Sequence, residues 1–412
     1  MGAGLLGIEL AMLTASEPSL FRVEAVYVAE RDPALHGGGA ASFYSTLAAR
    51  WRAAGVAEVP ALDVTTLTQY IALIRSSHLE RVEVPAGSLV IITAGMECRA
   101  RSAAGRGLGA ADPRSQVWME VVRIIRIAQQ LWPGRVGYML ENVAVDEDTE
   151  ERQLVALDHR RMVEQLGQPV SFDAAQVGAA AARRRSFWTN LLERPVLERQ
   201  LRAEQAAVER AGRPLTAQQC LEPGRTVATC TTHTTAAGYH PVNVFGAPVV
   251  VFPTLVSSAA SYAFRCGADG VPRQGVVLCE DRAAGVQWLD EPWACERERA
   301  MGFPAGYTGY EGWPERERCR LLGQSVDQHQ MRCLWRAVAA SPTESAAERG
   351  PVGVPEVAVR RSALLPAARI REALLVVGGA IPRGRGGGSG PLPATSGAGR
   401  WGGGGVAESM RR

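Results

Sequence analysis

The segment 88–101 places the strongest constraint on the fold, because a short apolar run ends there in a turn of small residues. The run at 89–92 is short and rich in β-branched residues, which favours a buried β-strand over a helix. The Thr-Ala-Gly that follows lets the backbone turn at the strand's carboxyl edge, where catalytic groups collect in open α/β sheets. We therefore expect this strand to deliver Cys98 to a loop. The alternative is a structural Cys98, since free cysteine commonly behaves as a small buried hydrophobe.

The composition is that of a globular chain of 412 residues, and 46% hydrophobic residues can build a sizeable core. No apolar run reaches the length of about 18 residues that a transmembrane helix needs, and the start lacks the pattern of a secretory signal. We therefore expect no membrane partner. The eight cysteines include no Cys-x-x-Cys pair, so we expect free thiols. A net charge of +3 neither requires nor excludes a nucleic-acid partner.

The chain opens with a glycine turn of the form G-x-G-x-x-G, made by Gly2, Gly4 and Gly7 ahead of an apolar helical pattern. Such a turn lets the backbone approach a nucleotide-like cofactor at a helix N-terminus, but the signature needs a strand immediately before it. No strand precedes Gly2. We expect either that the first strand is missing or that these glycines form only a flexible start.

Two acidic residues support the cofactor interpretation. The segment 21–30 predicts a second parallel strand ending in Glu30, 23 positions after Gly7. At this spacing a carboxylate accepts hydrogen bonds from ribose hydroxyls. Asp63 follows a short apolar segment and is a candidate partner for an adenine amino group, or alternatively a helix cap before Thr65.

A helix and another strand follow the cysteine. Apolar residues recur at helical spacing over 117–131 until a Pro-Gly pair stops the pattern, and the next apolar run predicts a strand that ends in Glu141 and Asn142. A right-handed crossover places the ends of two parallel strands at one edge of the sheet. We therefore expect Cys98 and Glu141 to face one pocket.

Arg183 and Arg185 precede an apolar Phe-Trp pair and share one side of a further predicted strand. The alternative for this arginine triplet is a solvated face. The segment 191–260 then changes to an alanine-rich helical piece and irregular Thr, Gly and Pro, which indicates an insertion or a small second lobe. One cysteine and two histidines at 230–240 lack a fourth ligand, and we expect no metal site. From about 341 the chain is too poor in apolar residues to order itself.

In this order the motifs resemble the DNA cytosine-5 methyltransferases, and within them the animal de novo and plant domains-rearranged enzymes. The resemblance covers about residues 2–335. Its motifs are the glycine turn, Glu30, Asp63, the segment from Gly95 to Cys98, Asp-Pro-Arg-Ser at 112–115, Glu-Asn-Val at 141–143, Arg-x-Arg at 183–185 with Phe-Trp-x-Asn at 187–190, Met-Gly-Phe-Pro at 301–304 with Tyr307 and Thr308, and Leu-Leu-Gly-Gln-Ser-Val at 321–326.

The resemblance implies an α/β, Rossmann-like S-adenosylmethionine-dependent methyltransferase fold, with a mostly parallel sheet and a small irregular target-recognition lobe. It implies four regions along the chain. These are a catalytic and cofactor-binding domain at 1–190 that lacks its first strand, a target-recognition region at 191–300, a return to the catalytic domain at 301–340 and a low-complexity, disordered tail at 341–412.

The resemblance also implies a reaction. The thiolate of Cys98 attacks carbon 6 of cytosine, so that carbon 5 accepts the methyl group of S-adenosylmethionine. Glu141 holds ring nitrogen 3 and the amino group, Arg185 holds the carbonyl oxygen, and Arg183 supports the loop. The substrate is duplex DNA with the target base flipped out. The implied cofactor-binding residues are Gly2, Gly4, Gly7, Glu30, Asp63, Asn142, Ser325 and Val326. The implied location is the nucleus, with a homo- or hetero-oligomer containing a related subunit as a further expectation.

Two positions depart from the family pattern. Glu97 stands where the family has proline before the cysteine, and its carboxylate opposes thiolate formation, which Arg99 offsets in part. Gln324 replaces the usual asparagine or arginine. Glu97 and the missing first strand leave open a catalytically weak or inactive homologue that binds DNA or an active partner, and Gln324 is a milder change. The tRNA-methylating branch of the same superfamily is a second alternative, although its typical Cys-Phe-Thr sequence is not found here. A third alternative is a dinucleotide oxidoreductase with a reactive cysteine.

Overall fold

The computed structural model describes residues 5, 7–15, 23, 25–28, 35, 43–56, 59–63, 74–86, 88–96, 101, 109, 112, 117–145, 153–212, 216–228, 251–257, 264, 266, 275–281, 283–309 and 313–339. Contacts divide the chain into two units, Met1–Arg360 and Arg361–Arg412, and every described residue belongs to the first. No helix in the described part of the chain is long and apolar enough to cross a membrane.

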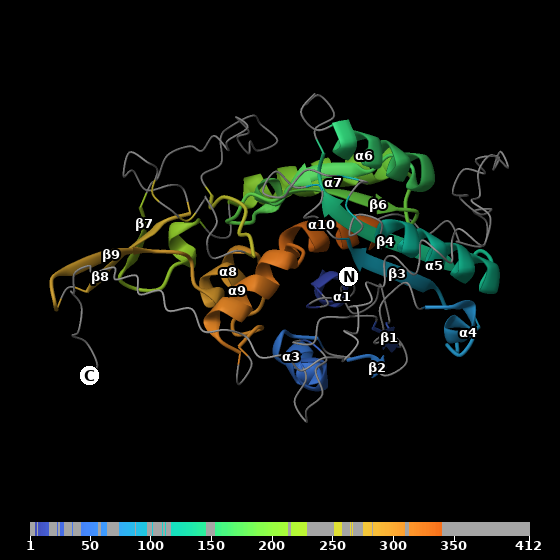
Figure 1. The fold of residues 1–412 in the computed structure, drawn as a ribbon, viewed down its shortest axis with the longest axis horizontal. Helices are drawn as coiled ribbons and strands as arrows, with labels where there is room; N and C mark the ends of the chain where they lie inside the picture. The colour runs from blue at the N-terminus through green and yellow to red at the C-terminus, as the bar shows by residue number, and fades with distance from the viewer. Residues whose placement is uncertain are drawn as a thin grey trace, which may run out of the picture. The chain divides into compact units, whose positions relative to one another are not determined.

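Helices and strands alternate along the first half of the described chain (Figure 1). The helices are α1 (Gly7–Ala15), η1 (Phe43–Thr46), α3 (Leu47–Ala53), α4 (Ser76–Leu79), α5 (Val117–Leu131), α6 (Gln153–Leu166), η6 (Ala174–Val177), α7 (Arg194–Ala211), η7 (Gln218–Cys220), α8 (Ala294–Ala300), α9 (Glu315–Gln324) and α10 (Gln328–Ala339). The strands are β1 (Ala25–Tyr27), β2 (Ala61–Asp63), β3 (Val90–Gly95), β4 (Val136–Val143), β5 (Val170–Asp173), β6 (Arg184–Thr189), β7 (Arg225–Val227), β8 (Val277–Asp281) and β9 (Val286–Asp290).

Two sheets carry the parallel strands. β1 pairs with β2 in parallel, and β3 pairs with β4 in parallel. β6 runs antiparallel between β4 and β5, which gives the order β3, β4, β6, β5. These parallel pairs and their helices confirm the predicted α/β class. Among the described residues no strand pairs with both β1 and β3, and the absence of a first strand stays a prediction.

Helices cover both faces of the four-stranded sheet. Tyr138 and Leu140 of β4 join a core with α5 and α6, whereas Met139 between them joins a core with α1, α7 and α10. Trp188 and Phe187 of β6 are divided between the two cores in the same way. Because successive side chains of a strand point to opposite faces, the sheet lies between two helical layers.

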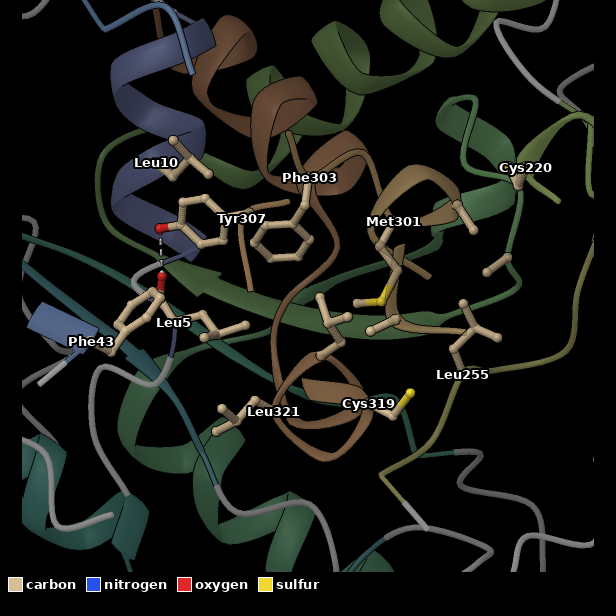
Figure 2. Packing of buried hydrophobic residues seen from close by; sticks show 14 of the residues in the cluster. Leu5, Leu10, Phe43, Cys220, Leu255, Met301, Phe303, Tyr307, Cys319 and Leu321 are labelled. Atoms are coloured by element: carbon tan, nitrogen blue, oxygen red, sulfur yellow. Dashed lines mark hydrogen bonds between the residues drawn. The ribbon is translucent and has the colours of Figure 1, made fainter. Parts of the chain in front are cut away.

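A third core joins the N-terminal segment to α8 and α9 (Figure 2). Leu5 and Leu10 pack there beside Phe303 and Tyr307, which follow α8. The hydroxyl of Tyr307 donates to the carbonyl oxygen of Leu5 at 2.9 Å. The Phe-Pro-Ala-Gly-Tyr segment at 303–307 therefore fixes the chain just before α1.

A small antiparallel sheet of β7, β8 and β9 is attached to α8 by a buried arginine. Nε of Arg225 lies 2.8 Å from Oε1 of Glu296, and its Nη1 lies 2.9 Å from Oδ2 of Asp290. The guanidinium also stacks 3.8 Å from the ring centroid of Trp293. This sheet lies within the region predicted to recognise the target, and that role and the boundaries of all four predicted regions stay predictions.

Two expectations about strands need correction. The predicted strand at 89–92 is present as β3, but Val90 to Thr93 are half-buried rather than buried. Among the described strands, β3 pairs only with β4. Its other edge therefore has no hydrogen-bonded neighbour among them. The apolar residues at 170–177 predict one continuous strand, but β5 ends at Asp173, because the Asp173 side chain accepts a hydrogen bond from the N–H of Ala175 at 2.8 Å and caps η6.

Candidate active site

The carboxyl ends of β3 and β4 lie side by side because these strands are parallel. Gly95 is opposite Glu141, and the backbone N–H of Met96 donates to the carbonyl oxygen of Glu141 at 2.9 Å. Cys98 comes two positions after Met96 in the sequence and lies outside the described residues. The chain therefore leaves the sheet next to Glu141 on its way to Cys98.

Glu141 and Arg185 form a buried ion pair between neighbouring strands. Nε of Arg185 lies 2.8 Å from Oε1 of Glu141, and the two side chains are 8% and 9% exposed. The antiparallel register places Val143 opposite Arg185, so both charges lie near the same end of β4. Each charge offsets the cost of burying the other. Together they offer a carboxylate that accepts from N–H groups and a guanidinium that donates to a carbonyl.

Arg183 contacts a different segment. Its Nη2 donates to the carbonyl oxygen of Ser325, and both Nη atoms lie 3.5 Å from the carbonyl oxygen of Gly323. Its backbone N–H donates to Oδ1 of Asp173 at 3.1 Å. In the described part of the chain, Arg183 thus supports the Gly-Gln-Ser-Val turn. Its predicted support of the Cys98 loop stays a prediction.

Three of the predicted cofactor residues meet at the start of α1. A Cβ added to Gly7 would lie 2.8 Å from Cγ2 of Val326 and 3.1 Å from Oγ of Ser325. The side-chain Nε2 of Gln328 donates to the carbonyl oxygen of Gly7 at 2.8 Å. Glycine is therefore needed at position 7 for this close approach. Gln328 is a residue that the sequence did not predict, and its only signal was the polar run after Val326.

Asp327 caps α10 at this turn. Its Oδ1 accepts the backbone N–H groups of His329 at 2.9 Å and Gln330 at 3.2 Å. Its Oδ2 is buried without a partner among the described residues. Burial raises the pKa of Asp327 to about 7, and it outweighs the two backbone hydrogen bonds and the nearby charge of Arg183. This carboxyl therefore changes its charge near neutral pH.

The remaining predicted cofactor residues are only partly described. Asn142 is buried in β4, where its Oδ1 accepts the backbone N–H of Val143 at 2.7 Å. Asp63 ends β2 opposite Tyr27 at the end of β1, so these two strand ends share one edge. The predicted residues outside the described part are Gly2, Gly4, Glu30, Cys98 and the side chain of Asp63.

A second buried ion pair was not predicted. Arg101 pairs with Asp158 of α6, and neither side chain is more than 2% exposed. The two residues are 57 positions apart, and no local pattern in the sequence connects them. In the sequence Arg101 has the pattern of a solvated arginine, so only the fold reveals this contact.

Two solved structures align along most of the chain. The S. pombe Dnmt2 methyltransferase shares 14% identity over 81% of this chain and 94% of its own, with a TM-score of 0.45. The Entamoeba histolytica methyltransferase EhMeth shares 12% identity over 82% of this chain and 95% of its own, also with a TM-score of 0.45. A search of curated proteins finds no match. The family model of the C-5 cytosine-specific DNA methylases matches residues 3–220, more than half of the sequence, and this chain belongs to that family.

Proposed function

We propose that this chain is a DNA cytosine-5 methyltransferase that works through a covalent bond between Cys98 and carbon 6 of a flipped cytosine. The observation that carries the proposal is the buried Glu141–Arg185 ion pair at the sheet edge from which the chain runs to Cys98. Successive Cα atoms are about 3.8 Å apart, so the Cα of Cys98 is within about 8 Å of that of Met96. This short separation supports the proposal that the thiol acts beside the pair.

The two charged side chains suit the ring of cytosine. The carboxylate of Glu141 accepts from the amino group and from ring nitrogen 3 when that nitrogen carries a proton, and the guanidinium of Arg185 donates to the carbonyl oxygen. Attack by the Cys98 thiolate forms the S–C6 bond, and electron density moves toward nitrogen 3 and carbon 5. After methylation, loss of the proton on carbon 5 restores the C5–C6 double bond as the S–C6 bond breaks. The thiolate is thereby returned.

Members of this family use S-adenosylmethionine, which when bound supplies the methyl group that carbon 5 takes up. The residues at the start of α1 fit such a group. Gly7 lets Ser325 and Val326 approach the first turn of α1 closely, and Oε1 of Gln328 is a buried acceptor with no partner among the described residues. These four residues would hold the cofactor, with Gln328 available to a hydroxyl or amino group.

The finer assignments also belong to this proposal. The proposed substrate is duplex DNA, and the target base must leave the stack because carbons 5 and 6 are inaccessible inside the duplex. The sheet of β7, β8 and β9 lies in the region assigned to target recognition. The motifs favour the animal de novo and plant domains-rearranged branch, a nuclear location and an oligomer with a related subunit.

A catalytically weak or inactive homologue is the second candidate function. Glu97 favours it, because a carboxylate next to Cys98 disfavours the thiolate that attacks carbon 6. Such a protein would bind DNA or an active partner without methylating it.

Methyl transfer from tritiated S-adenosylmethionine to duplex DNA tests the proposal. We expect incorporation by the wild type and by Cys266→Ala, which removes an exposed free thiol as a matched control. We expect none by Cys98→Ala. In addition, duplex DNA containing 5-fluorocytosine should form a covalent adduct that is lost in Cys98→Ala.

Each contrary outcome has a definite meaning. No incorporation by folded wild type that binds S-adenosylmethionine would favour the inactive homologue. Incorporation of the methyl group into tRNA in place of DNA would show that the substrate is RNA. An adduct that persists in Cys98→Ala would show that another residue is the nucleophile.

A further inference from the structure

In the described part of the chain β3 is hydrogen-bonded along one edge, where it pairs with β4. Its residues from Val90 to Thr93 are half-buried. The carboxyl end of this strand borders the candidate active site, since Gly95 lies opposite Glu141. A Cβ added to Gly95 would lie 3.6 Å from Oε2 of Glu141. A shift of β3 would therefore change the space beside a carboxylate of the candidate active site.

A polar side-chain contact joins β3 to α1. Oγ1 of Thr93 donates to Oε1 of Glu9, which is buried in the first turn of α1. Ile91, two positions before Thr93, packs against the core that contains residues of α1. Because alternate residues of a strand share a face, the contact lies on the face of β3 that α1 covers.

The first turn of α1 is itself fixed by two side chains of α10. Nε2 of Gln328 donates to the carbonyl oxygen of Gly7 at 2.8 Å, and the indole N–H of Trp335 donates to the carbonyl oxygen of Ile8 at 3.1 Å. Glu9 is the next residue in the chain. It therefore contacts β3 from a turn whose position is set by α10, and the same turn contains Gly7 of the proposed cofactor site.

Stability alone does not explain a carboxyl at this position. Burial raises the pKa of Glu9, and the hydrogen bond from Thr93 opposes that effect. Among the described residues, no ion pair compensates for the burial of this carboxyl. An apolar side chain would avoid the cost of burying a polar group. A hydrogen bond is directional, however, and it fixes the distance between the two groups that form it.

We propose that Glu9 and Thr93 are positioning residues for methyl transfer, an inference that rests on the proposed function. Their hydrogen bond sets the carboxyl end of β3 relative to the first turn of α1. The cofactor held at Gly7 and the cytosine held by Glu141 and Arg185 are thereby kept at a fixed separation. The contact acts through β3, so its loss leaves the residues that bind the cofactor unchanged.

The test compares four variants of the pair. Thr93→Val removes the donor, Glu9→Leu removes the acceptor, and Glu9→Leu/Thr93→Val replaces both by apolar side chains. Glu9→Gln keeps an acceptor oxygen and is the conservative variant. Tyr138→Phe is the matched control, because the buried hydroxyl of Tyr138 donates to the carbonyl oxygen of Leu166 on the opposite face of the sheet.

For each protein we measure thermal stability, affinity for S-adenosylmethionine by calorimetry and the single-turnover rate of methyl transfer. We also measure hydrogen exchange of the backbone amides at 90–96, with and without S-adenosylmethionine. Exchange reports how firmly β3 is held and does not require methyl transfer.

Thr93→Val and Glu9→Leu should each lose stability, because each leaves a buried polar group without its partner. The double variant should recover stability, yet its single-turnover rate should fall by about tenfold to a hundredfold, because small displacements of reacting groups are costly. Its affinity for S-adenosylmethionine should stay constant. Its amides at 90–96 should exchange several times faster than those of the wild type, and the cofactor should no longer slow them. Glu9→Gln and Tyr138→Phe should resemble the wild type in rate and exchange.

Three results would overturn the proposal. They are a double variant with the transfer and exchange rates of the wild type, a Glu9→Gln variant that is as slow as Glu9→Leu, and a Tyr138→Phe variant that is as impaired as the double variant. If the wild type transfers no methyl group, the proposed function fails on its own. Exchange at 90–96 in the double variant and in Tyr138→Phe, measured without cofactor, then still decides whether Glu9 and Thr93 hold β3.

Discussion

Replacing Asp327 by asparagine should stabilise the protein above neutral pH and leave it almost unchanged in acid. Burial raises the pKa of this carboxyl from 3.8 to about 7 in the folded chain. Because the pKa of Asp327 is higher in the folded chain than in the unfolded chain, its protonated form favours folding. This contribution to stability is fully present below pH 3.8. That contribution is lost as the pH rises through about 7, because the unfolded chain ionises freely.

The expected size follows from the shift. A change of one pKa unit corresponds to about 1.4 kcal/mol, so a rise of about three units amounts to about 4 kcal/mol. Asparagine keeps the oxygen that caps α10, so the hydrogen bonds from His329 and Gln330 are preserved. The variant also loses the attraction between ionised Asp327 and Arg183. We therefore expect a gain of about 2–4 kcal/mol at pH 8 and under about 1 kcal/mol at pH 4.

Urea unfolding of the wild type and Asp327→Asn between pH 4 and pH 8 measures this gain. Asp281→Asn is the matched control, because Asp281 also accepts two backbone N–H groups, from Ala283 and Ala284, but lies on an exposed turn. A stability difference for Asp327→Asn that stays the same at every pH would refute the reasoning. So would an equal pH dependence in Asp281→Asn.

Two further substitutions test other contacts. Gly7→Ala places a Cβ 2.8 Å from Cγ2 of Val326, so we expect a loss of about 1–3 kcal/mol in stability and weaker binding of S-adenosylmethionine by calorimetry; unchanged affinity would exclude the start of α1 from the cofactor site. Arg225→Met removes the positive charge that pairs with the fully buried Glu296, which keeps only the backbone N–H groups of Glu222 and Trp293, and urea unfolding should show a loss of about 3–5 kcal/mol. Arg194→Met, which removes a largely exposed pair, should lose less than about 1 kcal/mol, and equal losses in both variants would contradict this reasoning.

Local patterns in the sequence predict the elements that surround the site. The helix over 117–131 and the strand that begins at 136 have the predicted bounds, because their apolar spacing reflects the geometry of one helix or strand. The parallel pairing of β3 with β4 follows from the crossover between them, and it brings Gly95 beside Glu141 as expected.

Contacts between distant segments are the part that the sequence could not provide. Its spacing places Arg183 and Arg185 on one side of a strand, yet Arg183 donates to Ser325 while Arg185 pairs with Glu141. Buried partners of this kind depend on which helices and turns pack against the strand, and the period of the strand carries no such information. The sequence also could not predict that β3 is half-buried, because its burial depends on which distant segments pack beside its second edge.

The strand order has a consequence for how the protein folds. β6 follows β5 in the chain but lies between β5 and β4, so the sheet closes only after β6 has been synthesised and inserted. Glu141 is translated well before Arg185. The ion pair between them forms only when β6 is inserted into the sheet. Pairing between segments far apart in sequence forms late, because the intervening loop must first be closed. A nascent chain therefore contains Glu141 before its ion pair with Arg185 can form, and that pair is completed in the same step as the sheet.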